Sequence, residues 1–420
     1  MDIKTLLSGV DCSCGRRHEC DIDAVVIEKG AIKKLSDLCE KYKKILLVAD
    51  ENTYGAAGER VISAIRKKEL SSVIFPGEPL LIPDEAAIEK ITQALSDADL
   101  ILGIGSGVIQ DLCKYVSHFE KTPYMIVATA PSMDGYASTG AAMILGGMKE
   151  TVAAGLPRAI ILDTEILKDA PIEMIKAGYG DIIGKYSCLS DWKLSNIING
   201  EYLCDYIYNT TYEMIEKTLS VSDKLLSCDE EAVGILAEAL IVVGIMMSFA
   251  GSSRPASGSE HHLSHFFEIV GIVKDEPYFP HGIDVAYSTV VTSMIRDLVL
   301  NTDFNRKIYR PSQKEYEKRL KELYGKVANG CAGLQKKLGS YEIDRSEIYR
   351  SKEKEIKAAI EKVPSAEKIE AILNKVGLNI KDFYSLYGKE KIRGACAYAK
   401  DLKDRYTVLW LAYDLGLLEK

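Results

Sequence analysis

Four of the six histidines in this chain of 420 residues fall within one short stretch, which reads SGSEHHLSHFFE and, a little further on, FPHG. On a helix, His261 and His265 lie one turn apart on the same face, whereas His262 points away from that pair. His281 follows a proline and precedes a glycine, where a turn can bring a third imidazole to the same place. A catalytic divalent metal needs imidazole or carboxylate ligands and one open position. The stretch therefore predicts a metal site.

A carboxylate ligand would complete such a site. Asp181 is the candidate, because it stands in an otherwise apolar predicted helix that reads AGYGDIIGKY. For any one of these histidines alone, packing in the core or a place at the surface is the simpler explanation. The grouping of four favours the metal.

A glycine-rich turn predicts a second site. Gly103, Gly105 and Gly107 follow the apolar run LIL and precede VIQDLCKYV, so a strand ends in a turn that opens a helix. Backbone can approach a pyrophosphate there, and the helix N-terminus supplies N–H donors. The spacing departs from the usual Gly-x-Gly-x-x-Gly, so a plain tight turn stays an alternative.

Asp50 ends an earlier strand, where its carboxylate would bind an adenosine ribose and favour NADH over NADPH.

A polar loop, ATAPSMDGYASTG (128–140), follows the predicted strand YMIV. It leaves the strand at the end where α/β sheets bind ligands. Thr129, Ser132 and Ser138 carry hydroxyls for a phosphate or a nicotinamide, and Asp134 can hold a substrate hydroxyl. The same residue types also cap helices and turns, so the loop alone leaves both interpretations open.

The elements that must position these residues follow from apolar periodicity. Short apolar runs alternate with amphipathic stretches and predict strands over 45–50, 71–75, 100–105, 124–130 and 159–163, with a glycine-rich hairpin over 141–154. Pro171 suits a first helical position, and beyond it the chain reads as successive helices. We expect a Rossmann-like α/β domain with a parallel sheet over 1–168, which binds NAD. We expect an all-α domain that binds metal and substrate over 169–420.

Composition excludes several classes of function. The chain is 47% hydrophobic and 27% charged, as in ordinary globular proteins. Its net charge of -8 gives no general basic surface for nucleic acid or an acidic membrane. The longest apolar run, 239–250, is shorter than the roughly 18 residues of a membrane span, and the start does not read as a secretory signal. We expect a soluble cytoplasmic enzyme with a small-molecule substrate, no nucleic-acid partner and no membrane insertion.

Ten cysteines are scattered along the chain, and only Cys12, Cys14 and Cys20 cluster, together with His18. Reduced thiols are the default interpretation. The pattern Cys-x-Cys-Gly-x-x-His-x-Cys can hold zinc through thiolates and an imidazole. Its spacing is not that of a standard zinc finger, and the acidic residues around it equally suit a hairpin turn. A structural or incidental role is therefore favoured.

Taken together, these motifs resemble the iron-dependent alcohol dehydrogenase superfamily, which also includes dehydroquinate synthase, and within it the sn-glycerol-1-phosphate dehydrogenases, most closely the bacterial type. The resemblance runs from about residue 10 to the end and is carried by CSCGRRHEC, GSGVIQDLCK, PSMDGYAS, GYGDIIGKYSCLSDWKLS, SSRPASGSEHHLSH and RYTVLWLAYDLGLL. PSMDGYAS and SGSEHHLSH discriminate best. The segment SQKEYEKRLKELYGKV (312–327) has no clear place in the family pattern and lies away from the motifs.

The resemblance implies site residues and cofactors. It makes Asp181, His261 and His281 the metal ligands. It makes Asp134 and His265 catalytic residues that contact substrate, as Asp181 also does. With Asp50, the implied dinucleotide site consists of Gly105, Gly107, Val108, Ile109, Gln110, Asp111, Thr129, Ala130, Pro131, Ser132 and Ser138. The implied cofactors are NAD(H), with NADP(H) as the alternative, and one divalent zinc, nickel or iron ion.

The implied reaction is reversible hydride transfer between NAD(H) and the C2 position that links dihydroxyacetone phosphate to sn-glycerol 1-phosphate. The metal would act as a Lewis acid, and His265 would relay the proton. Lys185 and Arg254 are candidates for holding the substrate phosphate, with a structural ion pair as an equal alternative for each. A glycerol dehydrogenase acting on an unphosphorylated polyol and a lyase like 3-dehydroquinate synthase stay open. The resemblance also favours a homodimer.

Overall fold

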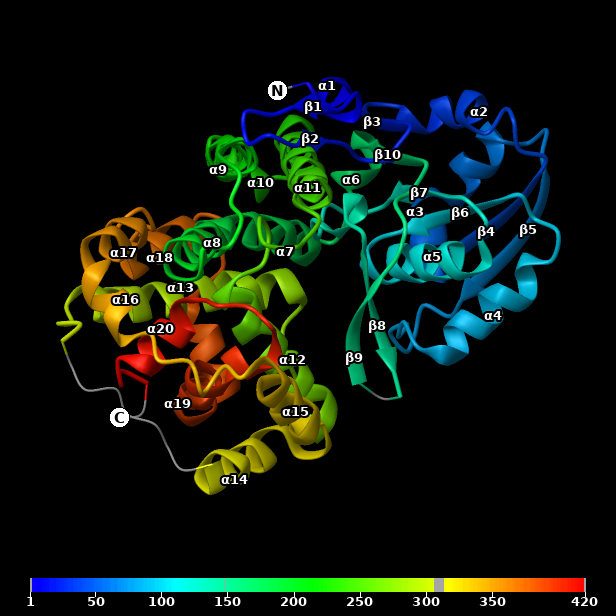
Figure 1. Ribbon diagram of the computed structural model, residues 1–420. Coiled ribbons are helices and arrows are strands. Elements are labelled where there is room, and N and C mark those ends of the chain that lie inside the picture. Colours follow the sequence, from blue (N-terminus) through cyan, green and yellow to red (C-terminus); the bar gives the residue numbers. More distant parts are fainter. Residues whose placement is uncertain (1, 147, 306–312, 419–420) are drawn as a thin grey trace. The chain divides into compact units, whose positions relative to one another are not determined.

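The computed structural model describes residues 2–146, 148–305 and 313–418 (Figure 1). The chain divides into two compact units. The first unit comprises residues 1–179 and 216–253, and the second comprises 180–215 and 254–420. The expected assignment of cofactor binding to 1–168, and of metal and substrate binding to 169–420, concerns function and stays a prediction.

The first unit is built on a six-stranded parallel sheet with the order β3-β10-β7-β6-β4-β5. Its strands are β3 (Ala24–Glu28), β4 (Lys44–Asp50), β5 (Glu69–Phe75), β6 (Leu100–Gly105), β7 (Tyr124–Ala128) and β10 (Ala159–Asp163). The predicted parallel sheet is confirmed. Strand β3 is missing from the predicted set because it is a short edge strand without a fully buried residue, so its apolar signal is weak.

Helices cover both faces of this sheet, because successive strand residues point to opposite faces. On one face, Leu47, Leu102 and Val127 belong to a single apolar cluster with Val61 of the helix that follows β4. On the other face lies the helix that follows β6: a Cβ added to Gly103 would come within 2.9 Å of the Cys113 Sγ on that helix. The helices concerned are η1 (Ala31–Lys34), α2 (Leu35–Leu38), α3 (Glu51–Ala64), α4 (Glu85–Leu95) and α5 (Gly107–Glu120).

Smaller elements complete the first unit. Two antiparallel hairpins are present, one formed by β1 (Val10–Asp11) with β2 (Arg17–His18) and one by β8 (Gly140–Leu145) with β9 (Met148–Ala153). The second of these lies where the glycine-rich hairpin is predicted. The helices are α1 (Ile3–Leu7), η2 (Gly135–Ala137), α6 (Thr164–Leu167), α10 (Ser222–Leu225) and α11 (Glu230–Ala250).

Helix α11 is the one described helix that is long and apolar enough to cross a membrane. Its best 18-residue window has a mean hydropathy of 2.3, but 78% of that window is buried inside the protein. Within the first unit it contacts β3, α6 and η2. This helix is therefore part of the protein core, and its composition follows from burial on all sides.

The second unit is helical throughout the residues that the structure describes, as predicted. Helices α7 (Ile172–Ile183) and α9 (Asp205–Leu219) contain two of the three boundaries between the units, and the third lies between residues 253 and 254. The other helices are α8 (Lys185–Asn199), α12 (Ser259–Lys274), α13 (His281–Leu300), α14 (Gln313–Tyr324), η3 (Gly325–Val327), α15 (Ala328–Leu338), α16 (Ser346–Ser351), α17 (Glu353–Ile360), α18 (Ala366–Asn374), α19 (Ile380–Tyr398), η4 (Ala399–Leu402) and α20 (Val408–Asp414). The segment 312–327 forms α14 and η3, except for Ser312, which lies outside the described residues.

Candidate functional site

Three of the predicted ligands come together in the second unit. Asp181 lies on α7, His261 on α12, and His281 is the first residue of α13. Each offers a ligand atom within 4.8 Å of the others, and Asp181 Oδ1 is 3.6 Å from His261 Nε2. Oxygen and nitrogen ligands placed tetrahedrally around zinc at normal bond lengths lie about 3.4 Å apart. The three side chains therefore have the spacing of a metal site.

Close packing between helices produces this spacing. A Cβ added to Gly180 would lie 2.3 Å from the carbonyl oxygen of Gly282 and 2.7 Å from the Ala286 Cβ. Only glycine at this position lets α7 approach α13 so closely. Asp181, the next residue on α7, is thereby held beside His281 at the start of α13.

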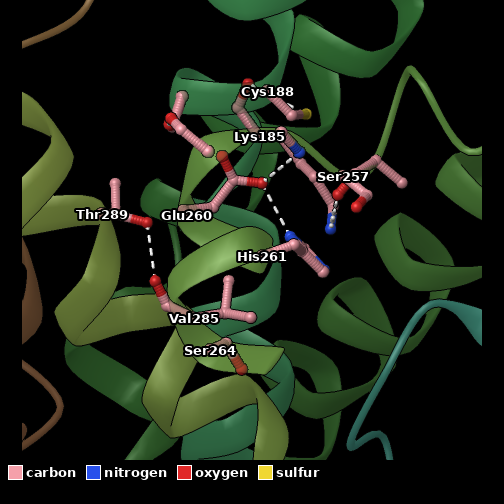
Figure 2. Close-up of polar contacts among 12 residues, drawn as sticks. Lys185, Cys188, Ser257, Glu260, His261, Ser264, Val285 and Thr289 are labelled. Carbon is pink, nitrogen blue, oxygen red and sulfur yellow. Dashed lines mark hydrogen bonds and ion pairs between the residues drawn. The ribbon is translucent and has the colours of Figure 1, made fainter. Parts of the chain in front are cut away.

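A buried carboxylate orients the first histidine. Figure 2 shows Glu260 bonded to His261, with 2.7 Å between Glu260 Oε1 and His261 Nδ1. The same oxygen accepts a hydrogen bond of 2.8 Å from the backbone N–H of Gly258. A carboxylate on Nδ1 fixes the imidazole so that Nε2 is presented to a metal. Sequence reasoning missed Glu260, because adjacent residues do not share a helix face and periodicity gives no signal for such a pair.

The charge states also suit a metal. Burial lowers the pKa of His261 well below its usual value, and the positive charge of Lys185 adds to this effect, so the imidazole is neutral at neutral pH. Burial alone would raise the pKa of Asp181, but the nearby Lys185, His261 and His281 outweigh it and lower that pKa. A neutral imidazole and an ionised carboxylate are the forms that bind metal ions.

Asp191 on α8 fixes the start of α12, which carries two of the predicted site histidines. Asp191 Oδ2 accepts a 2.7 Å hydrogen bond from the Ser259 backbone N–H, and Oδ1 accepts one of 2.8 Å from the Val408 N–H. Arg296 donates a further bond of 2.8 Å to Oδ1. These bonds join α8, α12, α13 and α20 around one buried carboxylate. Asp191 was also missed, since its partners are far apart in the sequence.

His265 lies beside the three ligands without belonging to the group. Its ring centroid is 6.0 Å from that of His261 and 5.4 Å from that of His281. Ser264 Oγ lies 3.4 Å from His281 Nδ1, where it can orient that ring. His262 is fully buried and is not part of the group of three. The arrangement places one imidazole next to the ligands, where it can exchange a proton with a bound substrate.

The two basic residues considered for phosphate binding are engaged inside the second unit. Lys185 donates hydrogen bonds of 2.7 Å to Asp181 Oδ1 and 3.0 Å to the Ala256 carbonyl. Arg254 forms an ion pair with Glu201, its Nε lying 2.7 Å from Glu201 Oε1. Both side chains are buried. The geometry favours the structural alternative for each.

The first unit places the predicted cofactor residues at one edge of its sheet. Strand β4 lies between β5 and β6, so the strand order reverses between β4 and β6. In parallel sheets, ligands bind outside the carboxyl ends of the strands at such a reversal. Val48 of β4 pairs with Gly103 of β6, which puts Asp50 and Gly105 together at that edge. The sheet topology thus supports the predicted dinucleotide site.

The glycines of the turn have different tasks. A Cβ added to Gly105 would lie 2.7 Å from Ile109 Cβ, so glycine lets α5 begin tight against its own strand. At Gly107, the first residue of α5, the nearest atom from another part of the chain would be Met133 Cε at 3.9 Å. Gly107 therefore leaves room for a ligand at the helix N-terminus, where backbone N–H groups attract phosphate oxygens.

Asp50 has a structural task of its own. Its Oδ1 accepts a 2.9 Å hydrogen bond from the Thr53 backbone N–H, and Thr53 Oγ1 accepts one of 3.1 Å from the Asp50 N–H. This reciprocal pair caps α3. This capping role is enough to explain an aspartate at position 50, and it requires no ligand. The contact between Asp50 and an adenosine ribose stays a prediction.

The side chains of two predicted cofactor residues point into the protein. Ile109 is buried, and Gln110 Nε2 donates to Tyr124 Oη at 3.0 Å and to the Tyr136 carbonyl at 3.1 Å. These residues would reach a cofactor through their backbone. The other residues of the predicted cofactor set lie at the start of α5 or in the loop after β7, namely Val108, Asp111, Thr129, Ala130, Pro131, Ser132 and Ser138. The predicted substrate residue Asp134 lies in the same loop.

A buried lysine that the sequence did not reveal ties the loop after β7 to α5. Lys114 Nζ donates to the carbonyls of Gly135 and Gly140 at 2.9 and 2.8 Å, and to Ser138 Oγ at 3.3 Å. Burial lowers the pKa of Lys114 to about 8, although Asp111 and Asp134 oppose this shift. Lys114 therefore holds the loop by bonds to backbone oxygens that helical periodicity cannot reveal.

Comparison with known proteins identifies the family. The model of the iron-containing alcohol dehydrogenase family matches residues 26–171. A glycerol-1-phosphate dehydrogenase [NAD(P)+] from Halalkalibacterium halodurans is 33% identical over 293 residues, which cover 68% of this chain and 73% of the relative. The chain belongs to the iron-containing alcohol dehydrogenase family.

Further similar proteins match over greater lengths. A glycerol-1-phosphate dehydrogenase [NAD(P)+] from Bacillus licheniformis is 28% identical over 415 residues, which cover 97% of this chain and 93% of the relative. The crystal structure of a probable glycerol dehydrogenase from Sinorhizobium meliloti has a TM-score of 0.62 at 17% identity and covers 95% of this chain and 97% of its own. This member of the family is therefore an oxidoreductase, and its chain shares the fold of that solved structure over nearly its whole length.

Proposed function

We propose that this family member interconverts dihydroxyacetone phosphate and sn-glycerol 1-phosphate with NADH or NADPH. The observation that carries the proposal is the relative from Bacillus licheniformis, named for this activity, which matches 97% of the chain. The cluster of Asp181, His261 and His281 also supports the proposal, because these three residues could hold the metal ion that the reaction needs. An aspartate and two histidines suit zinc, nickel or iron equally.

The residues in and around the ligand cluster would have different roles in this reaction. A divalent metal held by Asp181, His261 and His281 would supply a Lewis acid for the substrate carbonyl oxygen. Glu260 keeps His261 in the orientation that this requires, through its 2.7 Å bond to Nδ1. His265 would give a proton to the C2 oxygen during ketone reduction and take it back in the reverse direction, which is common work for an imidazole near neutral pH.

The first unit would hold the nicotinamide cofactor, which supplies or accepts the hydride. Its pyrophosphate would lie at the N-terminus of α5, where Gly107 leaves space. The loop after β7, held by Lys114, would present Thr129 and Ser132 to the cofactor. Asp134 would accept a hydrogen bond from a substrate hydroxyl.

The test compares ketones under one set of conditions. NADH oxidation is followed with dihydroxyacetone phosphate and with unphosphorylated dihydroxyacetone. Each charged hydrogen bond to the phosphate contributes about 1.5–3 kcal/mol, so two such bonds predict that kcat/KM is at least about 100-fold higher for the phosphate. The product is then assayed for its enantiomer, and sn-glycerol 1-phosphate is expected.

Two other outcomes contradict the proposal. Faster turnover of the unphosphorylated ketone would make the protein a glycerol dehydrogenase. Conversion of the phosphorylated heptulosonate substrate of 3-dehydroquinate synthase, with no net change in NADH absorbance, would make it a lyase. The variant Asp181→Ala, assayed in parallel, reports any activity that does not depend on the proposed metal ligands.

A further inference from the structure

The hairpin formed by β1 and β2 gathers two thiols and an imidazole in the first unit. The ligand atoms of Cys12, Cys14 and His18 all lie within 4.8 Å of one another, and Cys14 Sγ is 3.4 Å from His18 Nε2. Sulfur at 2.3 Å and nitrogen at 2.0–2.1 Å from a tetrahedral zinc ion lie about 3.6 Å apart. These three residues have the types and the spacing of zinc ligands.

Backbone hydrogen bonds place the two thiols. Cys12 N–H donates to the Arg16 carbonyl at 3.1 Å, and Gly15 N–H donates to the Cys12 carbonyl at 3.0 Å. Gly15 has a φ of +83°, a conformation that favours glycine, so the loop turns back sharply after Cys14. The ladder continues as Val10 pairs with His18. The backbone thus holds the ligands ready, which lowers the entropy cost of binding an ion.

Packing fixes the imidazole. His18 is only 2% exposed, and its ring stacks on Phe249 of α11 with 5.4 Å between the ring centroids. Cys12 and Cys14 are half-buried, and neither forms a disulfide. One zinc ion can bind the two thiols and the imidazole at the same time.

We propose that Cys12, Cys14 and His18 bind a zinc ion that holds the two strands of the N-terminal hairpin together. Thiolate ligands select soft cations and exclude magnesium or calcium. The site is structural and does not depend on the proposed function, because its residues carry none of the chemistry assigned to Asp181, His261 and His281. The proposal takes up the zinc alternative that the sequence left open, in place of the structural or incidental role favoured there.

Cys20, the remaining member of the sequence cluster, is not part of the group. Cys20 therefore serves as the matched control, being a cysteine of the same segment with no assigned contact to the ion.

The decisive measurement counts zinc in a protein whose other site has been removed. Asp181→Ala protein, purified with a reductant and without chelator, is expected to retain one zinc ion per chain. The additional changes Cys12→Ser and Cys14→Ser should remove that ion, whereas Cys20→Ser should leave it in place. Asp181→Ala protein that binds no zinc after incubation with zinc and desalting would overturn the proposal, as would zinc retention in the variant without Cys12 and Cys14.

Cobalt and alkylation give readouts that do not require the serine variants to fold. Cobalt bound by thiolates shows a sulfur-to-metal charge-transfer band, which an aspartate and two histidines cannot produce. Wild-type protein loaded with cobalt should show this band. In the zinc form, Cys12 and Cys14 should resist iodoacetamide, and both should react after a chelator removes the zinc. Absence of the band, alkylation rates unchanged by chelation, or a disulfide between Cys12 and Cys14 would each overturn the proposal.

Discussion

At the scale of single residues, His281 gives the clearest test of the metal trio. It is the first residue of α13 and is only partly buried, so replacing it removes a ligand with little loss of packing. His281→Ala should lose the metal bound by Asp181 and His261, and activity with it. The fall in metal affinity should exceed the about 10- to 100-fold seen when a residue that hydrogen-bonds to a ligand is removed. Metal analysis and NADH oxidation on the same sample measure both. Full metal content would contradict the assignment, and His118→Ala on α5 is the control.

His265 tests proton transfer separately from metal binding. Because it lies beside the three ligands but outside their group, His265→Ala should keep the metal. If the imidazole acts as a general acid, kcat should fall by about 10²- to 10⁴-fold, and the pH profile of kcat should lose its limb near neutrality. If the variant lost its metal, His265 would instead be a metal ligand. If it kept full metal content and the wild-type rate, His265 would have no role in the reaction.

Asp50 tests cofactor selection. Asp50 caps α3, and serine is an equally good capping residue, so Asp50→Ser should keep the helix and the free energy of unfolding. If the carboxylate also binds the ribose, the KM for NADH should rise, and NADPH should be accepted more readily because its phosphate no longer meets a negative charge. KM values for both cofactors decide this. If the preference between NADH and NADPH did not change, the only role of Asp50 would be to cap α3.

Residue types and spacing could predict the three metal ligands because histidines gather in one segment and Asp181 interrupts an apolar helix. They could not predict Glu260 or Lys114. The task of Glu260 depends on a bond to its immediate neighbour, and that of Lys114 on carbonyls 21 and 26 residues away. Such tasks arise only when the chain has folded, and no periodic pattern marks them beforehand.

At the scale of elements, the contact between α7 and α13 carries a prediction. Gly180→Ala places a Cβ where the Gly282 carbonyl oxygen would be 2.3 Å away, and backbone atoms cannot yield as a flexible side chain does. The helices should separate, so that metal affinity and thermal stability fall together. The matched control is Gly333→Ala on α15, where a Cβ meets nothing within 4 Å. Equal metal affinity in both variants would show that the close approach is not needed.

Apolar periodicity predicts the buried strands well, and it also indicates a helical segment before β4 without giving the type of helix. Ile32, Leu35, Leu38 and Tyr42 recur at helical spacing, whereas the structure has η1 followed by a short α2 that ends at Leu38. Three-residue spacing suits a 3₁₀-helix as well as an α-helix. Asp163, at the end of β10, accepts hydrogen bonds from the backbone around Ile32, and this distant partner favours the tighter turn.

At the scale of the whole molecule, the first unit is discontinuous in sequence. Its helix α11 follows residues 180–215, which belong to the second unit. Ser248 Oγ on α11 donates a 2.8 Å hydrogen bond to the Ala137 carbonyl, and a Cβ added to Gly244 would lie 2.7 Å from the Asp134 carbonyl oxygen. The loop predicted to bind the cofactor therefore rests on a helix that lies beyond the predicted boundary at residue 168.

This arrangement predicts how a fragment behaves. A chain of residues 1–179 lacks α11, so the apolar surfaces of β3, α6 and η2 that this helix contacts become exposed. The fragment should bind the dye ANS, lose its near-ultraviolet circular dichroism and fail to bind NADH, as compact states without fixed packing do. The full chain is the control. A fragment that unfolds cooperatively and binds NADH would show that α11 is dispensable.

The same discontinuity affects how the protein is made. A ribosome adds about 5–20 residues per second, so the 74 residues from 180 to 253 take about 4–15 seconds to translate. Throughout that interval the sheet has been synthesised, while the helix that covers part of it is still inside the ribosome or has not been polymerised. The speed of translation over this stretch therefore sets how long the apolar surface that α11 covers stays exposed on the nascent chain, where chaperones and neighbouring chains can bind it.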